Sequence, residues 1–209
     1  FTRKKGNKLP VFVDLKNENA QSRYIAEKIL ELREEGLELK DMAVLFRSGW
    51  HSNDLEVELS SRNIPFVKYG GQKFVEAAHI KDIISYLRII HNFHDQVSWL
   101  RALLLIPGIG PKSAQRIIEN LNSQKDKDNK LLKNEEVREL FGILAKFDKA
   151  DLRPEEAIEK FVKYYQPLLK NKYDDYHRRL NDIESLLRIA SRYVSLEDFL
   201  TDMALEPPE

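Results

Sequence analysis

From Gly71 onward, the apolar residues of the chain keep the spacing of an α-helix almost without a break. The clearest stripe runs through Ile80, Ile83, Ile84, Leu87 and Ile90. This spacing places the side chains on one helix face, which must be buried against other elements. Further helices are expected over 96–105, from Pro111 to about Leu121, over 135–147, 154–165 and 173–193, and after the cap Ser195. The sequence therefore predicts an all-helical unit over residues 71–209.

Before Gly71, short apolar runs alternate with helical patterns. The runs are Val11–Leu15, Asp41–Arg47 and Ile64–Gly70, and helices are expected over 19–35 and 52–62, with Ser52 as a cap and Gly36 as a stop. This alternation is typical of a parallel sheet, although three strands are too few to complete one. We therefore expect a partial α/β unit over residues 1–70 and a mostly α chain.

Composition narrows the class of protein. The 209 residues are 42% hydrophobic and 33% charged, which is typical of a globular protein. We expect no membrane span, because no apolar run approaches the roughly 20 residues that one requires. The absence of cysteine excludes disulfides and favours the cytoplasm. The chain does not begin with Met, so we expect part of a longer protein.

The stretch "IPGIGPKSAQRI" places a glycine-rich corner directly before a helix. Glycine lets the backbone approach another surface closely, and Pro111 suits the first position of the helix. The free amides of that first turn form a natural phosphate seat. With the preceding helix this predicts a helix–hairpin–helix that grips a nucleic-acid backbone without reading its sequence. The residues expected at the seat are Gly108, Ile109, Gly110, Lys112, Ser113 and Arg116.

An alternative for this corner is a tight connection between two packed helices, with Ile109 filling the core. The net charge of the chain is zero, so any nucleic-acid binding must be local. Local charge favours binding, because basic residues outnumber Asp82 and Asp95 between residues 81 and 116. These basic residues are Lys81, Arg88, Arg101, Lys112 and Arg116.

Two other candidate sites are weaker. His91, His94 and Asp95 could serve a metal-dependent nuclease, but no further ligand lies at suitable spacing, so no metal site is predicted. Four tyrosines near basic residues could stack on bases, although we expect them to pack between helices. These are Tyr164, Tyr165, Tyr173 and Tyr176.

Four segments in order resemble the UvrD/PcrA/Rep-type superfamily 1 DNA helicases. The segments are "DMAVLFRS", "NIPFVKYGGQKF", "IKDIISYLRIIHN" and "LLLIPGIGPKSAQRI". The resemblance implies that residues 1–70 are part of the second motor domain, 2A, and residues 71–209 are the helical insertion, 2B. It departs from the family pattern at Gly49, where Asn is usual, and at Ala77 and His79, where Arg and Glu are usual.

The resemblance also implies cofactors, DNA contacts and partners. The family uses ATP and Mg²⁺, but this chain has no Gly-Lys dipeptide and hence no phosphate-binding loop, so neither is expected to bind here. Arg47 and Lys73 match positions near the single strand, although an ion pair or a solvated side chain would also explain them. The hairpin at Gly108–Gly110 matches the position at which members of the family contact duplex DNA. We therefore expect part of a DNA helicase that contacts the other helicase domains and repair proteins. The alternative is a regulatory module that binds proteins and not DNA.

Overall fold

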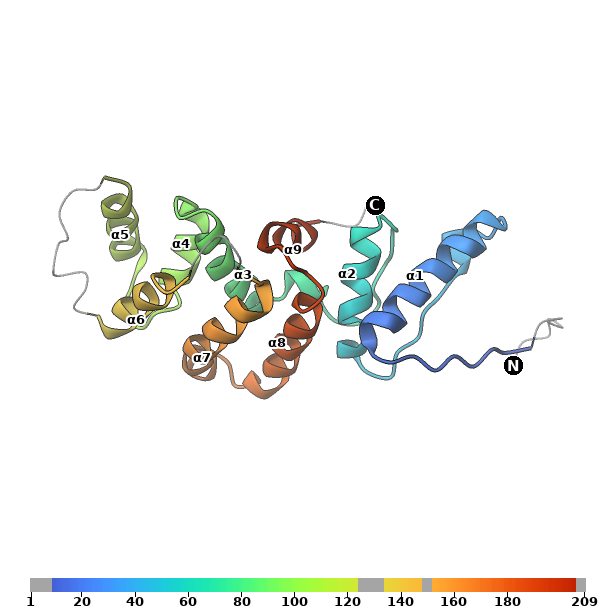
Figure 1. The fold of residues 1–209 in the computed structure, drawn as a ribbon. Helices are drawn as coiled ribbons and strands as arrows, with labels where there is room; N and C mark the ends of the chain where they lie inside the picture. The colour runs from blue at the N-terminus through green and yellow to red at the C-terminus, as the bar shows by residue number, and fades with distance from the viewer. Residues whose placement is uncertain (1–8, 124–133, 148–151, 206–209) are drawn as a thin grey trace.

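The structure, a computed structural model, describes residues 9–123, 134–147 and 152–205. In these ranges the regular structure is entirely helical. The α-helices are α1 (Glu18–Glu34), α2 (Asn53–Ser61), α3 (Ala78–His91), α4 (Gln96–Leu103), α5 (Pro111–Ser123), α6 (Glu135–Leu144), α7 (Pro154–Lys172), α8 (Tyr176–Ala190) and α9 (Leu196–Asp202). Three short 3-10 turns are η1 (Leu39–Asp41), η2 (Gly49–Ser52) and η3 (Phe74–Glu76). The molecule is elongated, with α1 near one end and α5 and α6 at the other (Figure 1).

The larger hydrophobic core surrounds α3, which packs against α4, α7, α8 and α9. The apolar stripe predicted for α3 is confirmed, since every one of its five side chains is buried. Tyr86, on the same helix, stacks on Phe161 of α7 with ring centroids 4.8 Å apart. Tyr164 and Tyr165 meet Tyr86 edge-on and are also buried, so their predicted packing role is confirmed.

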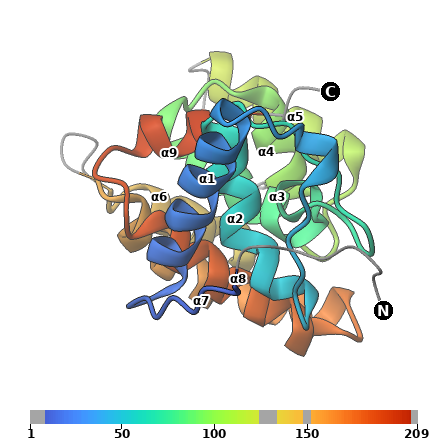
Figure 2. The ribbon, with the colours of Figure 1, turned by 90° about the vertical axis from the view of Figure 1, so that its right-hand side faces the viewer.

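A second, smaller core lies between α1 and α2. It is formed by Ala26, Leu55, Leu59 and Ile64. Seen end-on, α1 lies across α2 at the near end of the molecule (Figure 2). The two cores are separate clusters of buried side chains.

Polar contacts connect α2 to α8 where the two cores adjoin. The Arg192 guanidinium donates to Glu58 over 2.9 Å, and the Asn53 amide donates to Asp182 over 3.1 Å. His79 lies 3.1 Å from the same aspartate. Such a seam is typical of the boundary between two packed units, which is more polar than the interior of either.

The three predicted strands are not confirmed in the described chain. None of the runs Val11–Leu15, Asp41–Arg47 and Ile64–Gly70 forms a strand in the described chain, and no backbone hydrogen bond joins any two of them. A strand exists only through its ladder to a neighbour, and an apolar run cannot supply that neighbour. The α/β unit expected over residues 1–70 is therefore helical wherever it has regular structure.

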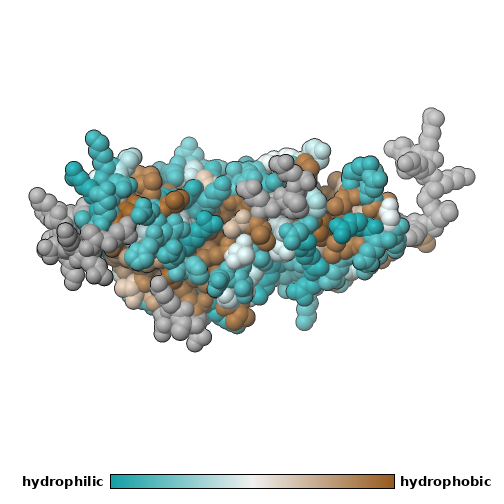
Figure 3. All heavy atoms as spheres, turned by 90° about the horizontal axis from the view of Figure 1, so that it is seen from above, coloured by the Kyte–Doolittle hydropathy of each residue, from teal (hydrophilic) through white to brown (hydrophobic). Residues whose placement is uncertain are grey.

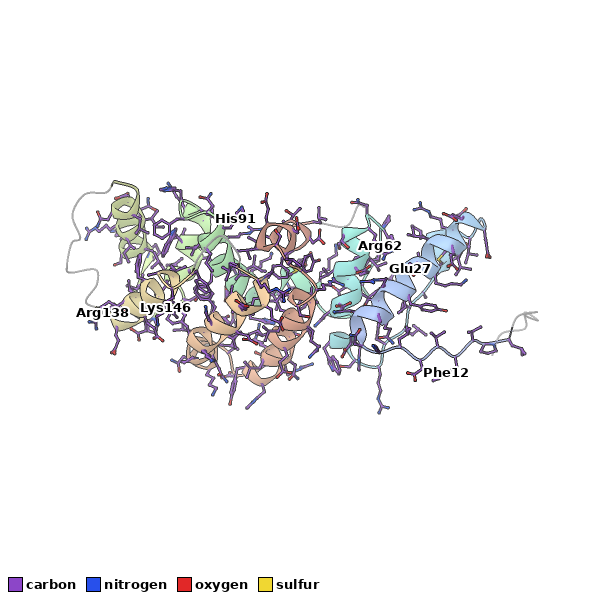
Figure 4. The ribbon with its side chains drawn as sticks, viewed as in Figure 1. Phe12, Glu27, Arg62, His91, Arg138 and Lys146 are labelled. Carbon is purple, nitrogen blue, oxygen red and sulfur yellow. The ribbon has the colours of Figure 1, made fainter. Side chains whose placement is uncertain are left out.

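These three runs hold most of the exposed large apolar side chains. Phe12 and Leu45 are each 92% exposed. Val67 is 73% exposed and Tyr69 is 93% exposed. Phe12 lies on the N-terminal segment, away from every helix (Figure 4). Elsewhere, hydrophobic residues show between hydrophilic ones along the upper face (Figure 3). Isolated apolar side chains of that kind are normal on a surface, whereas runs of them are not.

Several helix ends also differ from expectation. Ser52 does not cap α2, because its hydroxyl donates to the Gly49 carbonyl and to Glu56. The helix expected to end at Tyr165 continues to Lys172 through Pro167, where Leu168 and Leu169 remain buried. Gly36 follows α1 with φ of 95°, and Ser195 caps α9, as predicted. None of the described helices is both long and apolar enough to cross a membrane.

Candidate nucleic-acid interface

The corner between α4 and α5 starts from a firmly held helix. Asp95 caps α4 by accepting from the Ser98 amide over 3.0 Å and from the Ser98 hydroxyl over 2.7 Å. The Trp99 indole donates to the Phe93 carbonyl over 2.7 Å and stacks on Phe141 of α6. These contacts fix the direction from which the chain enters the corner.

The link between the helices turns tightly on itself. Ile106 is 2% exposed, and its carbonyl accepts from the Ile109 amide over 3.1 Å. This turn requires Gly108, whose φ is 80°. Ile109 is partly buried and packs against the larger core.

Helix α5 presents two different faces. Ala114, Ile117 and Ile118 are buried, whereas Lys112 and Arg116 are exposed. Neither of these cations has an ion-pair partner among the described residues. Glu119, the nearest acid along the helix, is bonded by the Gln115 amide instead. The apolar face thus anchors the helix, and the basic face is left for solvent or a ligand.

Nothing in the described part of the chain requires residue 110 to be glycine. Its backbone φ is not positive, and a Cβ built on it would meet nothing within 4 Å. Its carbonyl accepts from the Ala114 amide over 2.9 Å, which starts α5. The corner is braced by the Asn134 amide, 3.4 Å from the Pro107 carbonyl. Gly110 therefore leaves open space at the mouth of a fixed helix.

The first turn of α5 combines several features suited to a phosphate. The amides of Lys112 and Ser113 have no intrahelical carbonyl partner, because they lie in the first turn. The positive end of the helix dipole lies at the same place. Lys112 is exposed there, Ser113 is partly exposed, and Arg116 follows one turn later. Together these groups could bind an anion without contacting a base.

The two residues predicted near a single strand lie elsewhere in the molecule. Arg47 is exposed just before η2, which packs against α2. It has no ion-pair partner in the described ranges, so the alternative of a local ion pair finds no support there. Lys73 is partly exposed, and its ammonium lies 5.9 Å from the centre of the Phe66 ring. It follows Gly70 and Gly71, which both have positive φ. Helix α2, which follows Arg47 in the chain, lies toward the α1 end of the molecule, whereas α4 and α5 lie toward the other end (Figure 1).

Arg101, one of the basic residues counted in favour of DNA binding, forms an ion pair inside the fold. The Arg101 guanidinium donates to Asp82 over 2.7 Å and to the Ala78 carbonyl over 3.1 Å. Asp82 is 1% exposed and also accepts from the Tyr165 hydroxyl. The sequence analysis missed this cluster, although an aspartate beside the apolar stripe of a helix is a signal of a buried ion pair.

Buried polar groups around this cluster change their acidity. Burial raises the pKa of the Tyr165 hydroxyl, and the nearby Asp82 carboxylate raises it further. Tyr165 therefore stays protonated at neutral pH and donates to Asp82. The cluster is a structural joint between three helices.

The histidines considered for a metal do not form a site. Asp95 is used as the cap of α4, and no group of three or more metal-binding side chains occurs in the residues that the structure describes. His79, where the resemblance expects glutamate, is buried and lies 3.1 Å from Asp182 and 3.1 Å from Arg179. Its role is to connect α3 with α8.

The chain is similar in sequence to known proteins over nearly its whole length. The family model of the UvrD-like helicase C-terminal domain matches residues 2–206. A probable DNA helicase II homolog from Mycoplasma capricolum is 33% identical over 171 residues, which is 82% of this chain and 23% of that protein. The ATP-dependent DNA helicase PcrA of Staphylococcus epidermidis is 35% identical over 114 residues, which is 54% of this chain and 15% of that protein.

A third relative, PcrA of Staphylococcus aureus, is 33% identical over 108 residues, 51% of this chain and 15% of that protein. The chain thus spans less than a quarter of the length of these curated relatives. The family match covers nearly the whole chain and includes both the corner and the segments before it. The chain therefore belongs to the family of UvrD-like helicase C-terminal domains.

Proposed function

We propose that this chain is the part of an ATP-dependent DNA helicase that holds the duplex and regulates its unwinding. The duplex contact is the α4–α5 corner, formed by Gly108, Ile109, Gly110, Lys112, Ser113 and Arg116. The observation that supports it best is Gly110, which is glycine where nothing in the described chain excludes a side chain. A phosphate backbone approaching the corner would exclude one. The motor that binds ATP and Mg²⁺ belongs to the rest of the parent protein.

The kind of binding follows from the chemistry of the corner. Backbone amides, one lysine and one arginine contact phosphates but do not distinguish base pairs. The net charge is zero, so the rest of the molecule adds little attraction. Affinity should therefore be weak. It should fall steeply as the salt concentration rises, because the counterions that binding releases then gain less entropy.

Titration of the chain with a short duplex at low salt tests this contact. Lys112→Ala and Arg116→Glu should each weaken binding several-fold and lower its salt dependence. Arg23→Glu is the matched control, because Arg23 is exposed on α1 and the change in charge is the same. If the Arg116 and Arg23 variants behave alike, or if the unchanged chain does not bind, the corner is only a helix connection.

A second contact is proposed at Arg47 and Lys73 for the single strand. The guanidinium of Arg47 has no ion-pair partner among the described residues and can fork onto a phosphate. Gly70 and Gly71 keep the backbone beside Lys73 free of side chains. Arg47→Ala and Lys73→Ala should weaken binding of a single strand and leave duplex binding at the corner unchanged. A nucleoside triphosphate is titrated in parallel, because a guanidinium binds its phosphates equally well.

The segments before Gly71 are proposed to belong to a partial α/β motor domain, residues 1–70, with residues 71–209 as the helical domain. The exposed apolar runs support this, because strands of a sheet would cover such side chains. The other helicase domains would supply those strands. The separate core between α1 and α2 also favours the division. The proposed location is the cytoplasm, which suits a chain without cysteine.

A regulatory module that binds repair proteins is the second candidate. It is favoured by two exposed apolar residues, Val97 on α4 and Leu104 directly after it, which lie about two turns apart. A purified repair protein should then bind the chain, and Val97→Asp should abolish this binding. Duplex affinity that depends on Arg116 would favour the first candidate, and its absence together with protein binding would favour the second.

A further inference from the structure

A small hollow lies where η2 and α2 meet α8, at the start of α1. Its lining is Glu18, Trp50, His51, Asp54, Ser185 and Arg188. The hollow has room for about one water molecule. Its walls come from α1 and α2, the helices of the smaller core, and from α8 of the larger one. The hollow is therefore part of the junction at which the two cores adjoin.

The carboxylate of Asp54 on the wall of this hollow lacks donors. Its side chain is only 9% exposed, and neither of its oxygens has a hydrogen-bond partner among the described residues. Ser22 of α1 lies nearby but outside hydrogen-bond geometry. A buried acceptor without a donor is costly, and in folded proteins such a group is commonly satisfied by an ordered water molecule.

Two ion pairs at the same junction are too long for direct hydrogen bonds. Glu18 Oε1 lies 3.9 Å from Arg188 Nε, and Asp54 Oδ1 lies 3.7 Å from the Arg192 guanidinium. A direct N–H···O hydrogen bond spans about 2.7–3.2 Å. Charged groups that face each other across more than about 3.5 Å leave space for a bridging water.

Further polar atoms beside the hollow are also unmatched. Asn19 Oδ1 and Arg192 Nη2 are buried and have no hydrogen-bond partner in the described ranges. Asn19 follows Glu18 in α1, and its amide lies 3.4 Å from the Arg188 carbonyl. With the two oxygens of Asp54, these are four of the five such atoms in the described chain. Direct contacts therefore leave both donors and acceptors unsatisfied at one place, which is the pattern that a buried water resolves.

We propose that the hollow binds one water molecule, which accepts from the Arg188 guanidinium and donates to the carboxylates of Asp54 and Glu18. Arg188 has N–H groups beyond the one that donates to the Ser185 hydroxyl, and each carboxylate has acceptor positions to spare. Three hydrogen bonds are typical of a buried water. Because such a bridge is nearly as favourable as a direct hydrogen bond, it joins α1, α2 and α8 although their ion pairs do not touch.

The charges at the hollow favour water over a metal ion. The carboxylates of Glu18 and Asp54 each face a guanidinium, 3.9 and 3.7 Å away respectively. A cation would be repelled by both guanidinium groups as well as attracted by the carboxylates, so it would gain little. A group of three or more metal-binding side chains is absent from the described part of the chain. The ligand is therefore neutral, both donates and accepts, and is no larger than the hollow.

A crystal structure of the unchanged chain at high resolution tests the proposal directly. Density for one water molecule should lie within hydrogen-bond distance of Asp54 and of Glu18 or Arg188. An empty hollow, or an Arg188 or Arg192 side chain that bonds Asp54 directly, would overturn the proposal. Manganese soaked into the crystals tests for a cation. No anomalous signal is expected in the hollow, and a signal there would also overturn the proposal.

A variant that fills the hollow then locates the water. Ser185→Thr keeps the hydroxyl on the wall and adds a methyl group, which should displace the water. Ser191→Thr is the matched control, because Ser191 is exposed on the same helix and its hydroxyl also bonds a carbonyl of α8. The density should be absent in Ser185→Thr and present in Ser191→Thr. Density that persists in Ser185→Thr would place the water outside the hollow and overturn the site.

The water site does not depend on the proposed DNA contacts. Both serine variants should bind a duplex as the unchanged chain does, because neither residue belongs to the α4–α5 corner. A failed duplex titration would therefore contradict only the proposed function, and an empty hollow only the water site.

Discussion

The hydroxyl of Tyr165 on α7 donates a hydrogen bond of 2.7 Å to the carboxylate of Asp82 on α3. Arg101 of α4 reaches the same carboxylate over 2.7 Å, and Lys172 lies 3.9 Å from it. One buried acid thus joins three helices at the centre of the helical region. Tyr165 and Arg101 lie within hydrogen-bond distance of the carboxylate, whereas Lys172 is farther away and more exposed. We therefore expect Lys172 to contribute least to stability.

We predict that Tyr165→Phe lowers the free energy of unfolding by about 1.5–3 kcal/mol, the range for a hydrogen bond to a charged group. Asp82→Ala should cost more, because it removes the acceptor of both Tyr165 and Arg101. Lys172→Met is the control: the lysine is 46% exposed and not hydrogen-bonded, so less than about 1 kcal/mol should be lost. Urea unfolding measures all three. Equal losses for Tyr165→Phe and Lys172→Met would contradict this ranking.

Asp54 should make the chain more stable in mild acid. Burial raises the pKa of this carboxyl above its ordinary value of 3.8, and Arg192 and the nearby Ser22 offset only part of the effect. A carboxyl with a raised pKa stabilises the folded state most when protonated. Its contribution is therefore complete below pH 3.8 and is lost as the pH rises through the raised pKa.

The matching variant is Asp54→Asn, which removes the charge and keeps the shape. At neutral pH it should raise the free energy of unfolding by roughly 1 kcal/mol, and this gain should shrink in acid. Thermal unfolding of both chains across the acidic range measures the difference. A gain that does not depend on pH would show that Asp54 is not the group responsible.

Alanine substitutions at the two glycines of the corner, Gly108 and Gly110, should have different effects on stability and on duplex affinity. Gly108→Ala forces an alanine to φ of 80° and should cost about 1–2 kcal/mol of stability. Gly110→Ala meets open space at an ordinary φ, so stability should change by less than about 0.5 kcal/mol. Duplex affinity should nevertheless fall for Gly110→Ala, because the added methyl group occupies the space proposed for the phosphate.

Both the Gly108→Ala and the Gly110→Ala chains are therefore measured by thermal unfolding and by duplex titration. A Gly110→Ala chain that is stable and binds the duplex normally would remove the main support for the corner as a DNA contact. A destabilised one would show that Gly110 is required by the fold.

Glu56 should be the most sensitive residue of α2. Its carboxylate is buried and accepts from the Lys68 ammonium over 2.6 Å and from the Phe74 amide over 2.9 Å. Glu56→Ala should cost about 3–5 kcal/mol, because it leaves a mostly buried lysine and a backbone amide without a partner. Glu31→Ala on α1 is the control, since its pair with Lys28 is exposed and should contribute less than about 1 kcal/mol. Similar losses in urea unfolding would disprove this interpretation of Glu56.

Much of the fold was predictable from the sequence because helix formation depends on local spacing. The stripe from Ile80 to Ile90, the stop at Gly36 and the cap at Ser195 were all read correctly. In the candidate interface, the sequence predicted a turn before a helix that begins at Pro111, and the structure agrees. It could not predict that Arg101 is held by Asp82, whereas Lys112 and Arg116 have no ion-pair partner among the described residues. Such pairings depend on residues far apart in the chain.

Two features were decided by packing between distant segments. The runs Val11–Leu15, Asp41–Arg47 and Ile64–Gly70 have the composition of strands, but a ladder needs a partner and none of them finds one in the described chain. The polar seam beside α2 needs Arg192, which lies more than one hundred residues from its acceptor Glu58, so no local pattern could indicate it. Local sequence decided where the helices lie, because their hydrogen bonds close within four residues. The polar joints required the tertiary structure, because long-range contacts determine which polar groups among the described residues already have partners.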